Sequence, residues 1–287
     1  MSNLDIEKLL AQMNPPLKLI NQIAIGGQKC VYKARKVDSS DVVFKVLKQN
    51  SNNISRLQRE IRAVSLIKDA NVPLIIDTNV DNITDENELI WVIEEYVEGT
   101  PLRKLLSQNK LFSVSEVVQF LDTMFRILHK SENMQIVHRD IKPENIMVDQ
   151  MNQFWLIDFG ISRHLDLTSI TPTDSPFGPF TVGYAASEQF RNSKKNIDIR
   201  TDLFSLGVVC AEMIIGHNPF IQNTDDVLQV IKKIEQQPLP LYKISGDNQF
   251  LLARFIKTLG DNRISRRPRN ITEAIQLFEI IKKTLTL

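Results

Sequence analysis

The chain is poor in cysteine. Its 287 residues include only two cysteines, Cys30 and Cys210, which lie far apart and form no CxxC spacing. A disulfide framework or a zinc site would need more cysteines or a closer spacing, so neither is indicated. Two distant thiols fit a reducing compartment, and we therefore expect a cytoplasmic protein.

An excess of charge of either sign and a long apolar run are also lacking. The chain has 35 basic and 34 acidic residues, which leave a formal charge of +1. We therefore expect no nucleic-acid partner and no anionic membrane surface as partner. The most apolar stretch, Leu203 to Ile215, is interrupted by Ser205 and Glu212 and is too short to span a bilayer. It predicts a buried helix that ends at Gly216.

The N-terminal segment, Met1 to Asn14, has neither the basic start nor the apolar core of a signal peptide. No internal repeat, low-complexity tract or long linker interrupts the chain. The length suffices for one large domain or for two lobes that share one ligand.

Polar residues gather in the middle of the chain. Residues 138–145 read HRDIKPEN, and Asp158-Phe159-Gly160 follows after two short apolar runs, 146–148 and 154–157. The two runs and the polar stretch between them predict a β-hairpin. The hairpin would bring Asn145 and Asp158 to the same end of its two strands. Two oxygen ligands at one place suit Mg²⁺.

A second feature lies near the N-terminus. Gly26 and Gly27 lie in a turn within residues 23–34, between two runs with strand character. Glycines allow backbone N–H groups to approach phosphates closely, although a Gly-Gly turn is also common in an ordinary hairpin.

These motifs resemble those of protein kinases, and most closely the catalytic domain of bacterial Hanks-type (eukaryotic-like) serine/threonine kinases. The resemblance covers about residues 17–281. It implies an α+β, bilobal protein-kinase-like fold, with a small β-rich lobe that has one main helix, a larger and mostly helical lobe, and the active site in the cleft. We expect a single kinase domain over residues 1–287, with the N-lobe at about 11–97, the hinge at about 95–99 and the C-lobe at about 100–287.

The resemblance assigns the catalytic roles. Asp140 would accept the proton of the incoming hydroxyl group, and Lys142 would neutralise the transferring phosphoryl group. Asn145 and Asp158 would bind Mg²⁺, or Mn²⁺ in its place. This small set of groups suffices for phosphoryl transfer, because the transition state is mostly charge spread over oxygens. Lys142 at this spacing is typical of serine/threonine kinases.

Lys45 is the expected phosphate contact of the first lobe. Val42-Val43-Phe44-Lys45 stands where the family has V-A-I-K, which implies that Lys45 contacts the α- and β-phosphates of ATP. Glu60 lies on a predicted helix over 54–67, near its apolar stripe, and the resemblance supplies Lys45 as its partner. The alternative is a surface Glu60 that pairs locally with Arg56 or Arg59.

The remaining ATP contacts are also implied by the resemblance. The loop that would cradle the phosphates contains Ala24, Ile25, Gly26, Gly27 and Val31. In this loop, Ala24 and Lys29 replace two of the three glycines of the usual family pattern.

The hinge would meet the edge of adenine through backbone groups of Glu95 and Val97. Glu94 stands where the family usually has an apolar residue. Either Glu94 binds a nearby cation, or the alignment slips by one position.

The segment from Asp158 to Glu188 resembles an activation segment, with Ser187 in place of the usual proline. Glu188 would pair with Arg267, or else with Arg266. Asp202 would brace the catalytic loop.

Arg139, directly before the expected base, usually accompanies control by phosphorylation in this family. We expect autophosphorylation within residues 168–175, with Thr171 and Thr173 favoured. The other interpretation is that this Ser/Thr/Pro-rich loop has no phosphosite.

Two signals predict helices in the second lobe. Thr100-Pro101 predicts the start of a short helix, with Thr100 as its cap. Ser113 and Glu116 form a capping-box pattern that begins a helix reaching about Lys130.

The sequence favours an ATP-dependent serine/threonine protein kinase and leaves two alternatives. One is a pseudokinase that acts as a binding module, in view of the altered glycine loop, Glu94 and Ser187. The other is a kinase for a small molecule, against which stand Lys142 and the peptide-binding loop around Thr181. Neither the protein substrate nor the oligomeric state follows from the sequence.

Overall fold

The computed structural model describes residues 3–25, 29–47, 54–83, 89–159, 182–190, 197–224 and 226–286, without the side chains of residues 3, 54–57 and 60. The chain divides into two compact units, Met1–Glu98 and Gly99–Leu287. The division falls within residues 95–99, where the sequence predicts a hinge.

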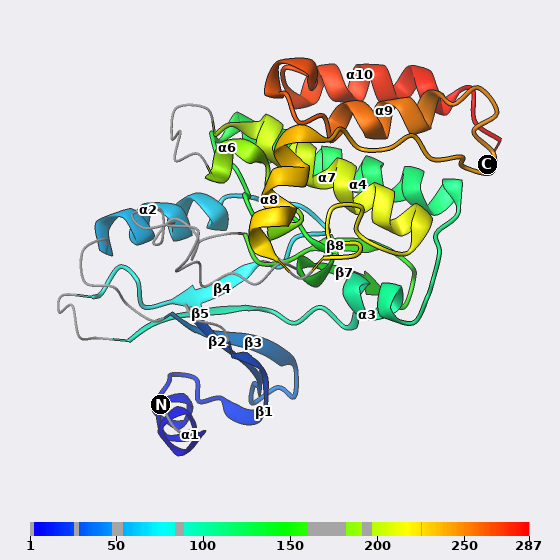
Figure 1. Cartoon of the computed structure of the whole chain (residues 1–287). Coiled ribbons are helices and arrows are strands. Elements are labelled where there is room, and N and C mark those ends of the chain that lie inside the picture. The colour runs from blue at the N-terminus through cyan, green and yellow to red at the C-terminus, as the bar shows by residue number, and fades with distance from the viewer. Residues whose placement is uncertain are drawn as a thin grey trace. The chain divides into compact units, whose positions relative to one another are not determined.

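The first unit is built on an antiparallel sheet with the strand order β1-β2-β3-β5-β4 (Figure 1). Its predicted helix forms as α2 (Ile54–Ser65) and ends two residues earlier than expected. The strands are β1 (Lys18–Ile25), β2 (Lys29–Arg35), β3 (Asp41–Leu47), β4 (Ile75–Thr78) and β5 (Ile90–Glu95). Lys45 lies in β3, between β2 and β5.

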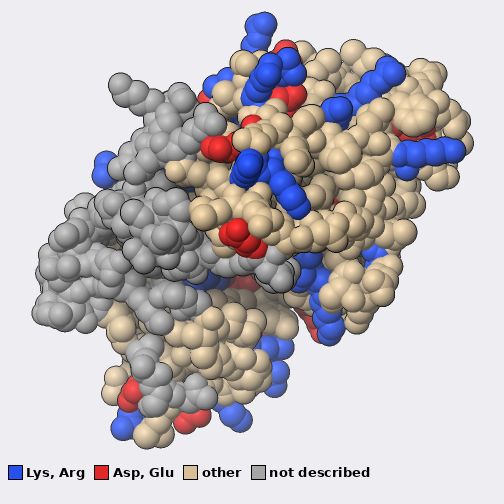
Figure 2. All heavy atoms as spheres, in the orientation of Figure 1, with Lys and Arg blue, Asp and Glu red and all other residues tan. Residues whose placement is uncertain are grey.

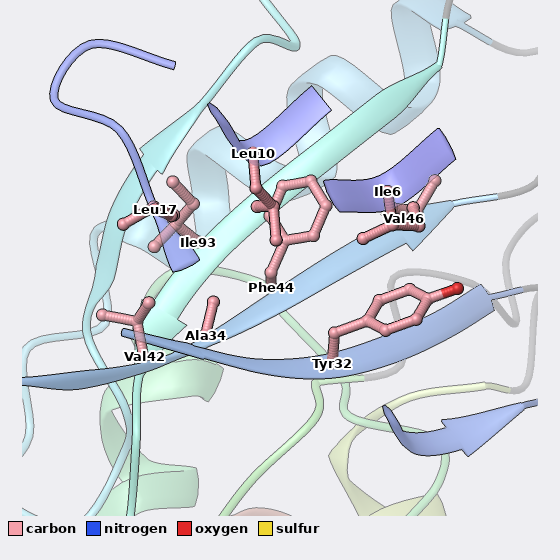
Figure 3. Close-up of a cluster of buried hydrophobic side chains, with 9 residues drawn as sticks. All are labelled: Ile6, Leu10, Leu17, Tyr32, Ala34, Val42, Phe44, Val46 and Ile93. Carbon is pink, nitrogen blue, oxygen red and sulfur yellow. The ribbon is translucent and has the colours of Figure 1, made fainter. Parts of the chain in front are cut away.

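A further helix, α1 (Asn3–Ala11), precedes the sheet. The sequence analysis did not predict it, because a segment of nine residues gives only a weak periodic signal. Ile6 and Leu10, four positions apart, are fully buried and point towards the strands, where they join a cluster with Tyr32, Phe44 and Val46 (Figure 3). Helix α1 therefore covers the face of β2 and β3 that carries Phe44.

The second unit is mostly helical and contains a small sheet with the order β6-β7-β8. The strands are β6 (Gly99–Pro101), β7 (Ile146–Asp149) and β8 (Phe154–Leu156). Its described α-helices are α3 (Leu102–Ser107), α4 (Val114–Asn133), α6 (Ser187–Phe190), α7 (Ile199–Ile215), α8 (Val227–Gln236), α9 (Leu251–Leu259) and α10 (Ile271–Lys282), and its described 3-10 helices are η1 (Pro143–Asn145) and η4 (Ile264–Arg266).

The two predicted helix starts have different outcomes. The capping box of α4 is confirmed, since the Ser113 side chain accepts from the Glu116 N–H and the Glu116 side chain accepts from the Ser113 N–H. The predicted cap at Thr100 is wrong. Thr100 and Pro101 are extended and pair with β7, so that α3 begins at Leu102. Strand pairing here overrides the local capping signal.

Helix α7 forms the centre of the second unit. Most of its residues are buried, and it ends at Gly216 in the left-handed conformation with φ of 82°, as predicted. Gly207 allows α7 to approach the end of α9, because a Cβ atom there would lie 2.5 Å from the Gly260 nitrogen. A helix buried on all sides is apolar around its whole circumference, which explains the apolar run in the sequence.

The described surface carries charges of both signs. Lys and Arg are interspersed with Asp and Glu on the face drawn in Figure 2. Among the described residues, no helix has the length and apolar character needed to cross a membrane.

Candidate active site

The hairpin predicted between Asn145 and Asp158 is confirmed. Strands β7 and β8 pair antiparallel, with Ile146 opposite Leu156. At the open end of the hairpin the Ile157 N–H donates to the Asn145 carbonyl oxygen over 2.9 Å. The hairpin therefore brings Asn145 close to Ile157, the residue directly before Asp158.

Three polar side chains meet in the loop before this hairpin. The Lys142 ammonium lies 3.1 Å from Oδ2 of Asp140. The Asn145 amide donates to the same Oδ2 over 3.0 Å and to the Asp140 backbone carbonyl over 2.8 Å. Asp140 thus faces a positive charge and an amide donor. Both interactions hold Oδ2 of the carboxylate in place.

Asp202 in α7 holds the backbone of this loop. Its carboxylate accepts from the backbone N–H groups of His138 and Arg139, each over 2.8 Å, which confirms the predicted brace. Burial raises the pKa of Asp202 to about 7, although the two N–H groups act in the opposite direction. A single buried carboxylate therefore holds two successive residues ahead of Asp140.

The backbone of the loop is held in an unusual conformation. Arg139 has φ of 63° and Asp158 has φ of 67°, both in the left-handed region. For residues other than glycine this region costs on the order of 1–3 kcal/mol and is often found at functional sites. The Gln189 amide of α6 also donates to the Arg139 carbonyl over 3.0 Å. Tertiary contacts thus stabilise a conformation that the local sequence does not favour.

The donor set at Asn145 and Asp158 fits a hard divalent cation. Both Asn145 hydrogen bonds to Asp140 come from its amide nitrogen, so the amide oxygen is oriented away from that acceptor. Amide and carboxylate oxygens are the ligands that Mg²⁺ prefers. The residues present therefore suit a hard divalent cation such as Mg²⁺.

A partly buried charged network lies beside this loop, and the sequence analysis missed it. The Arg103 guanidinium donates to Glu144 and to Glu212, each over 2.7 Å, and also to the hydroxyl group of Tyr184, which donates to Glu212. Burial, together with the Glu212 carboxylate, raises the pKa of Tyr184 and keeps its hydroxyl group protonated. Glu212 within an apolar run was the one available signal, because a buried carboxylate needs a partner.

The predicted ion pair of Glu188 involves Arg267. The two side chains are almost fully buried and lie 2.6 Å apart. Arg266 is largely exposed, and its guanidinium lies 4.0 Å from the Asp261 carboxylate. The structure therefore decides between the two arginines.

In the first unit, Lys45 forms an ion pair with Glu94. The ammonium lies 2.5 Å from Oε2 of Glu94, and both residues are buried. Of the two explanations for Glu94, the structure supports cation binding. The side chain of Glu60 is outside the described residues, and its pairing with Lys45 stays a prediction.

The two runs that flank the glycine loop form strands, as expected, and these strands pair antiparallel. Ala24 lies opposite Val31, and Ile25 lies opposite Cys30. Gly26 and Gly27 themselves are outside the described residues.

At the expected hinge, the Glu95 N–H donates to the Leu74 carbonyl over 2.9 Å. This N–H group is therefore already used within the sheet. Val97 is buried.

Much of the expected activation segment also lies outside the described residues. This applies to 160–181, which includes the favoured phosphosites Thr171 and Thr173 and the loop residue Thr181. Of its end, residues 182–188 are described. The Gly183 carbonyl accepts from the Asn218 amide, and the Tyr184 carbonyl accepts from the Ser205 hydroxyl group.

The chain belongs to the protein kinase family. The family model described as "Protein kinase domain" matches residues 17–277, which cover both units. The β-rich first unit and the helical second unit agree with this assignment.

Several curated relatives are bacterial serine/threonine-protein kinases. A probable serine/threonine-protein kinase of Clostridium acetobutylicum is 28% identical over 92% of this chain and 40% of its own length. PrkC of Bacillus subtilis is 31% identical over 71% of this chain and 31% of its own length, and PknB of Mycobacterium leprae is 30% identical over 85% and 39%. The chain thus spans about two fifths or less of these relatives.

Proposed function

We propose that the chain is an ATP-dependent serine/threonine protein kinase, which transfers the γ-phosphate of ATP to hydroxyl groups of proteins. The observation that carries the proposal is the meeting of Asp140, Lys142 and Asn145 within one loop. The two distant cysteines support a cytoplasmic location, in a reducing compartment.

Asp140 orients the hydroxyl group of the substrate and accepts its proton. The Asn145 amide holds the carboxylate in place through Oδ2. Lys142, on the same oxygen, neutralises charge on the transferring phosphoryl group. Proton acceptance of this kind is worth about 10²- to 10⁴-fold in rate.

Asn145 and Asp158 are the proposed ligands of Mg²⁺, which neutralises phosphate charge when it is bound. Lys45 contacts the α- and β-phosphates, with Glu60 as its proposed partner from α2. Because the Glu95 N–H donates to Leu74, we assign the adenine contact of Glu95 to its carbonyl group.

The phosphate-binding loop of the proposal comprises Ala24, Ile25, Gly26, Gly27 and Val31. Ala24 and Val31 lie opposite each other where β1 and β2 approach this loop. The pairing brings the two ends of this loop together, and backbone N–H groups of a glycine-containing loop can bind a phosphate.

The proposal is tested with labelled ATP, with and without Mg²⁺, on a general protein substrate and on the chain itself. We expect Asp140→Asn to lower the rate by about 10²- to 10⁴-fold. Asp122→Asn is the matched control, because Asp122 is an exposed α4 residue that pairs with Lys282. Its rate should equal that of the wild type.

Two outcomes would contradict the proposal. If the wild type shows no Mg²⁺-dependent transfer and Asp140→Asn is no different, the chain is a pseudokinase. If phosphate appears on a small metabolite and on no protein, it is a small-molecule kinase.

The same experiment tests autophosphorylation. We propose that phosphate is added within residues 168–175, at Thr171 and Thr173 first, and that a phosphate there pairs with Arg139. Mass spectrometry after incubation with ATP should find these residues modified. An active enzyme with all of them unmodified would refute this mode of control.

A further inference from the structure

A charged side chain occupies a buried position in the sheet of the first unit. Glu94 lies on β5 and is 7% exposed, and Lys45 on β3 is 8% exposed. The two side chains form an ion pair at 2.5 Å. Lys45 is the lysine that the proposed function places on the phosphates of ATP. The Glu94 carboxylate therefore lies within the sheet, in direct contact with the Lys45 ammonium.

The geometry of the sheet fixes this pair. Strands β3 and β5 pair in continuous register from Val42 opposite Glu95 to Leu47 opposite Ile90. Val43 is opposite Glu94, and Lys45 is opposite Val92, so that Lys45 and Glu94 are diagonal neighbours on one face of the sheet. Neither backbone can shift without breaking the ladder.

The opposite face of the same strands is packed by another element. Phe44 and Ile93, which alternate with Lys45 and Glu94, belong to the cluster that α1 covers (Figure 3). Packing on that face holds the two strands in place, so the position of the ion pair depends on the sheet and on α1.

The ion pair is compatible with phosphate binding. An ammonium group donates up to three hydrogen bonds, and the bond to Glu94 requires one of them. A buried ammonium also needs a charged partner when no nucleotide is present, because an unpaired buried charge is costly. Glu94 can therefore hold Lys45 both before and during ATP binding.

We propose that Glu94 is a positioning residue that holds the Lys45 ammonium in place for the phosphates of ATP. The carboxylate lies on the strand next to Lys45, so this support does not come from helix α2. The inference rests on the proposed function, since it assigns a partner to the lysine of that same site.

The test is the dissociation constant of Mg²⁺–ATP, measured by calorimetry on the whole chain, because it requires no turnover. We expect Glu94→Gln to raise this constant about tenfold, the effect of losing one charged hydrogen bond. Glu94→Asp keeps the charge and should raise it less. Asp41→Asn is the matched control, since Asp41 on β3 pairs with Lys33 at 2.7 Å in the same sheet, and it should leave the constant unchanged.

Kinetics separate positioning from mere stability. We expect Glu94→Gln to raise KM for ATP and to change kcat by less than about threefold, because Lys45 binds the phosphates in both the ground state and the transition state. A purely structural role would lower the melting temperature and leave KM unchanged. If Glu94→Gln does not fold, an unchanged dissociation constant in Glu94→Asp, whose carboxylate is one methylene shorter, overturns the inference.

Other results are equally decisive. An unchanged dissociation constant in folded Glu94→Gln would overturn the inference, and tighter binding would show that Glu94 competes with phosphate for Lys45. Failure of the proposed function is distinct from both, since it appears as a wild type that binds ATP and transfers no phosphate.

Discussion

At the scale of single residues, buried charges do most to shape the candidate site. Asp202 is completely buried and yet accepts from two backbone N–H groups of the loop that carries Asp140. Its carboxylate holds the loop by geometry, while its burial favours the protonated form. The stability of the loop should therefore depend on pH.

The pKa of Asp202 in the folded chain is about 7, raised by burial from 3.8. The folded state then binds the proton more tightly than the unfolded state, so this group's contribution to stability is greatest below about pH 4 and is lost as pH rises to about 7. We expect the difference in unfolding free energy between the wild type and Asp202→Asn to fall with pH in this range, by at most about 1.4 kcal/mol per unit.

Urea unfolding at several pH values between 4.5 and 7.5 measures this difference. Subtracting the unfolding free energy of the variant removes the opposite contributions of other carboxylates. Asp41 is one of these, because its hydrogen bond with Arg35 lowers its pKa to about 2. A difference that is constant across this range would contradict a raised pKa for Asp202.

At the scale of elements, α1 shows how a short helix gains stability from packing. A helix of nine residues is only marginally stable by itself, and its contacts with the sheet supply the missing stability. Leu10 is fully buried in the cluster on β2 and β3, whereas Leu4 of the same helix is 60% exposed.

We expect Leu10→Ala to lower the unfolding free energy by about 2–5 kcal/mol, because it leaves a cavity in this cluster. Leu4→Ala is the matched control and should change it by less than about 0.5 kcal/mol. Chemical denaturation followed by the fluorescence of Trp91 and Trp155 measures both variants. Equal effects of the two substitutions would mean that α1 does not pack on the sheet.

At the scale of the whole molecule, the proposed ligand should stabilise the fold. A ligand that binds only the folded state adds about 2.7 kcal/mol at a concentration one hundred times its dissociation constant. We expect Mg²⁺–ATP to raise the melting temperature of the wild type, and of Asp122→Asn, by several degrees.

The increase should be much smaller in Asp158→Asn, because a neutral amide replaces a proposed ligand of the cation. Differential scanning fluorimetry over a series of ATP concentrations measures the shifts. The same increase in Asp158→Asn as in the wild type would remove Asp158 from the metal site.

The sequence alone determined the parts of the molecule that are encoded by local pattern. The β7–β8 hairpin, the capping box at Ser113 and the glycine end of α7 follow from turn, cap and periodicity signals that act over a few residues. The catalytic loop was identified by its motif, since its residues are contiguous in the chain.

Only the tertiary structure decided which distant side chains meet. The pair of Lys45 and Glu94 depends on the β3–β5 register, and the choice of Arg267 over Arg266 depends on which side chain the fold buries. Thr100 was predicted as a helix cap and instead lies in β6, because pairing with β7 outweighs a local signal. Buried charges find their partners through the fold, because the cost of leaving them unpaired exceeds any local preference.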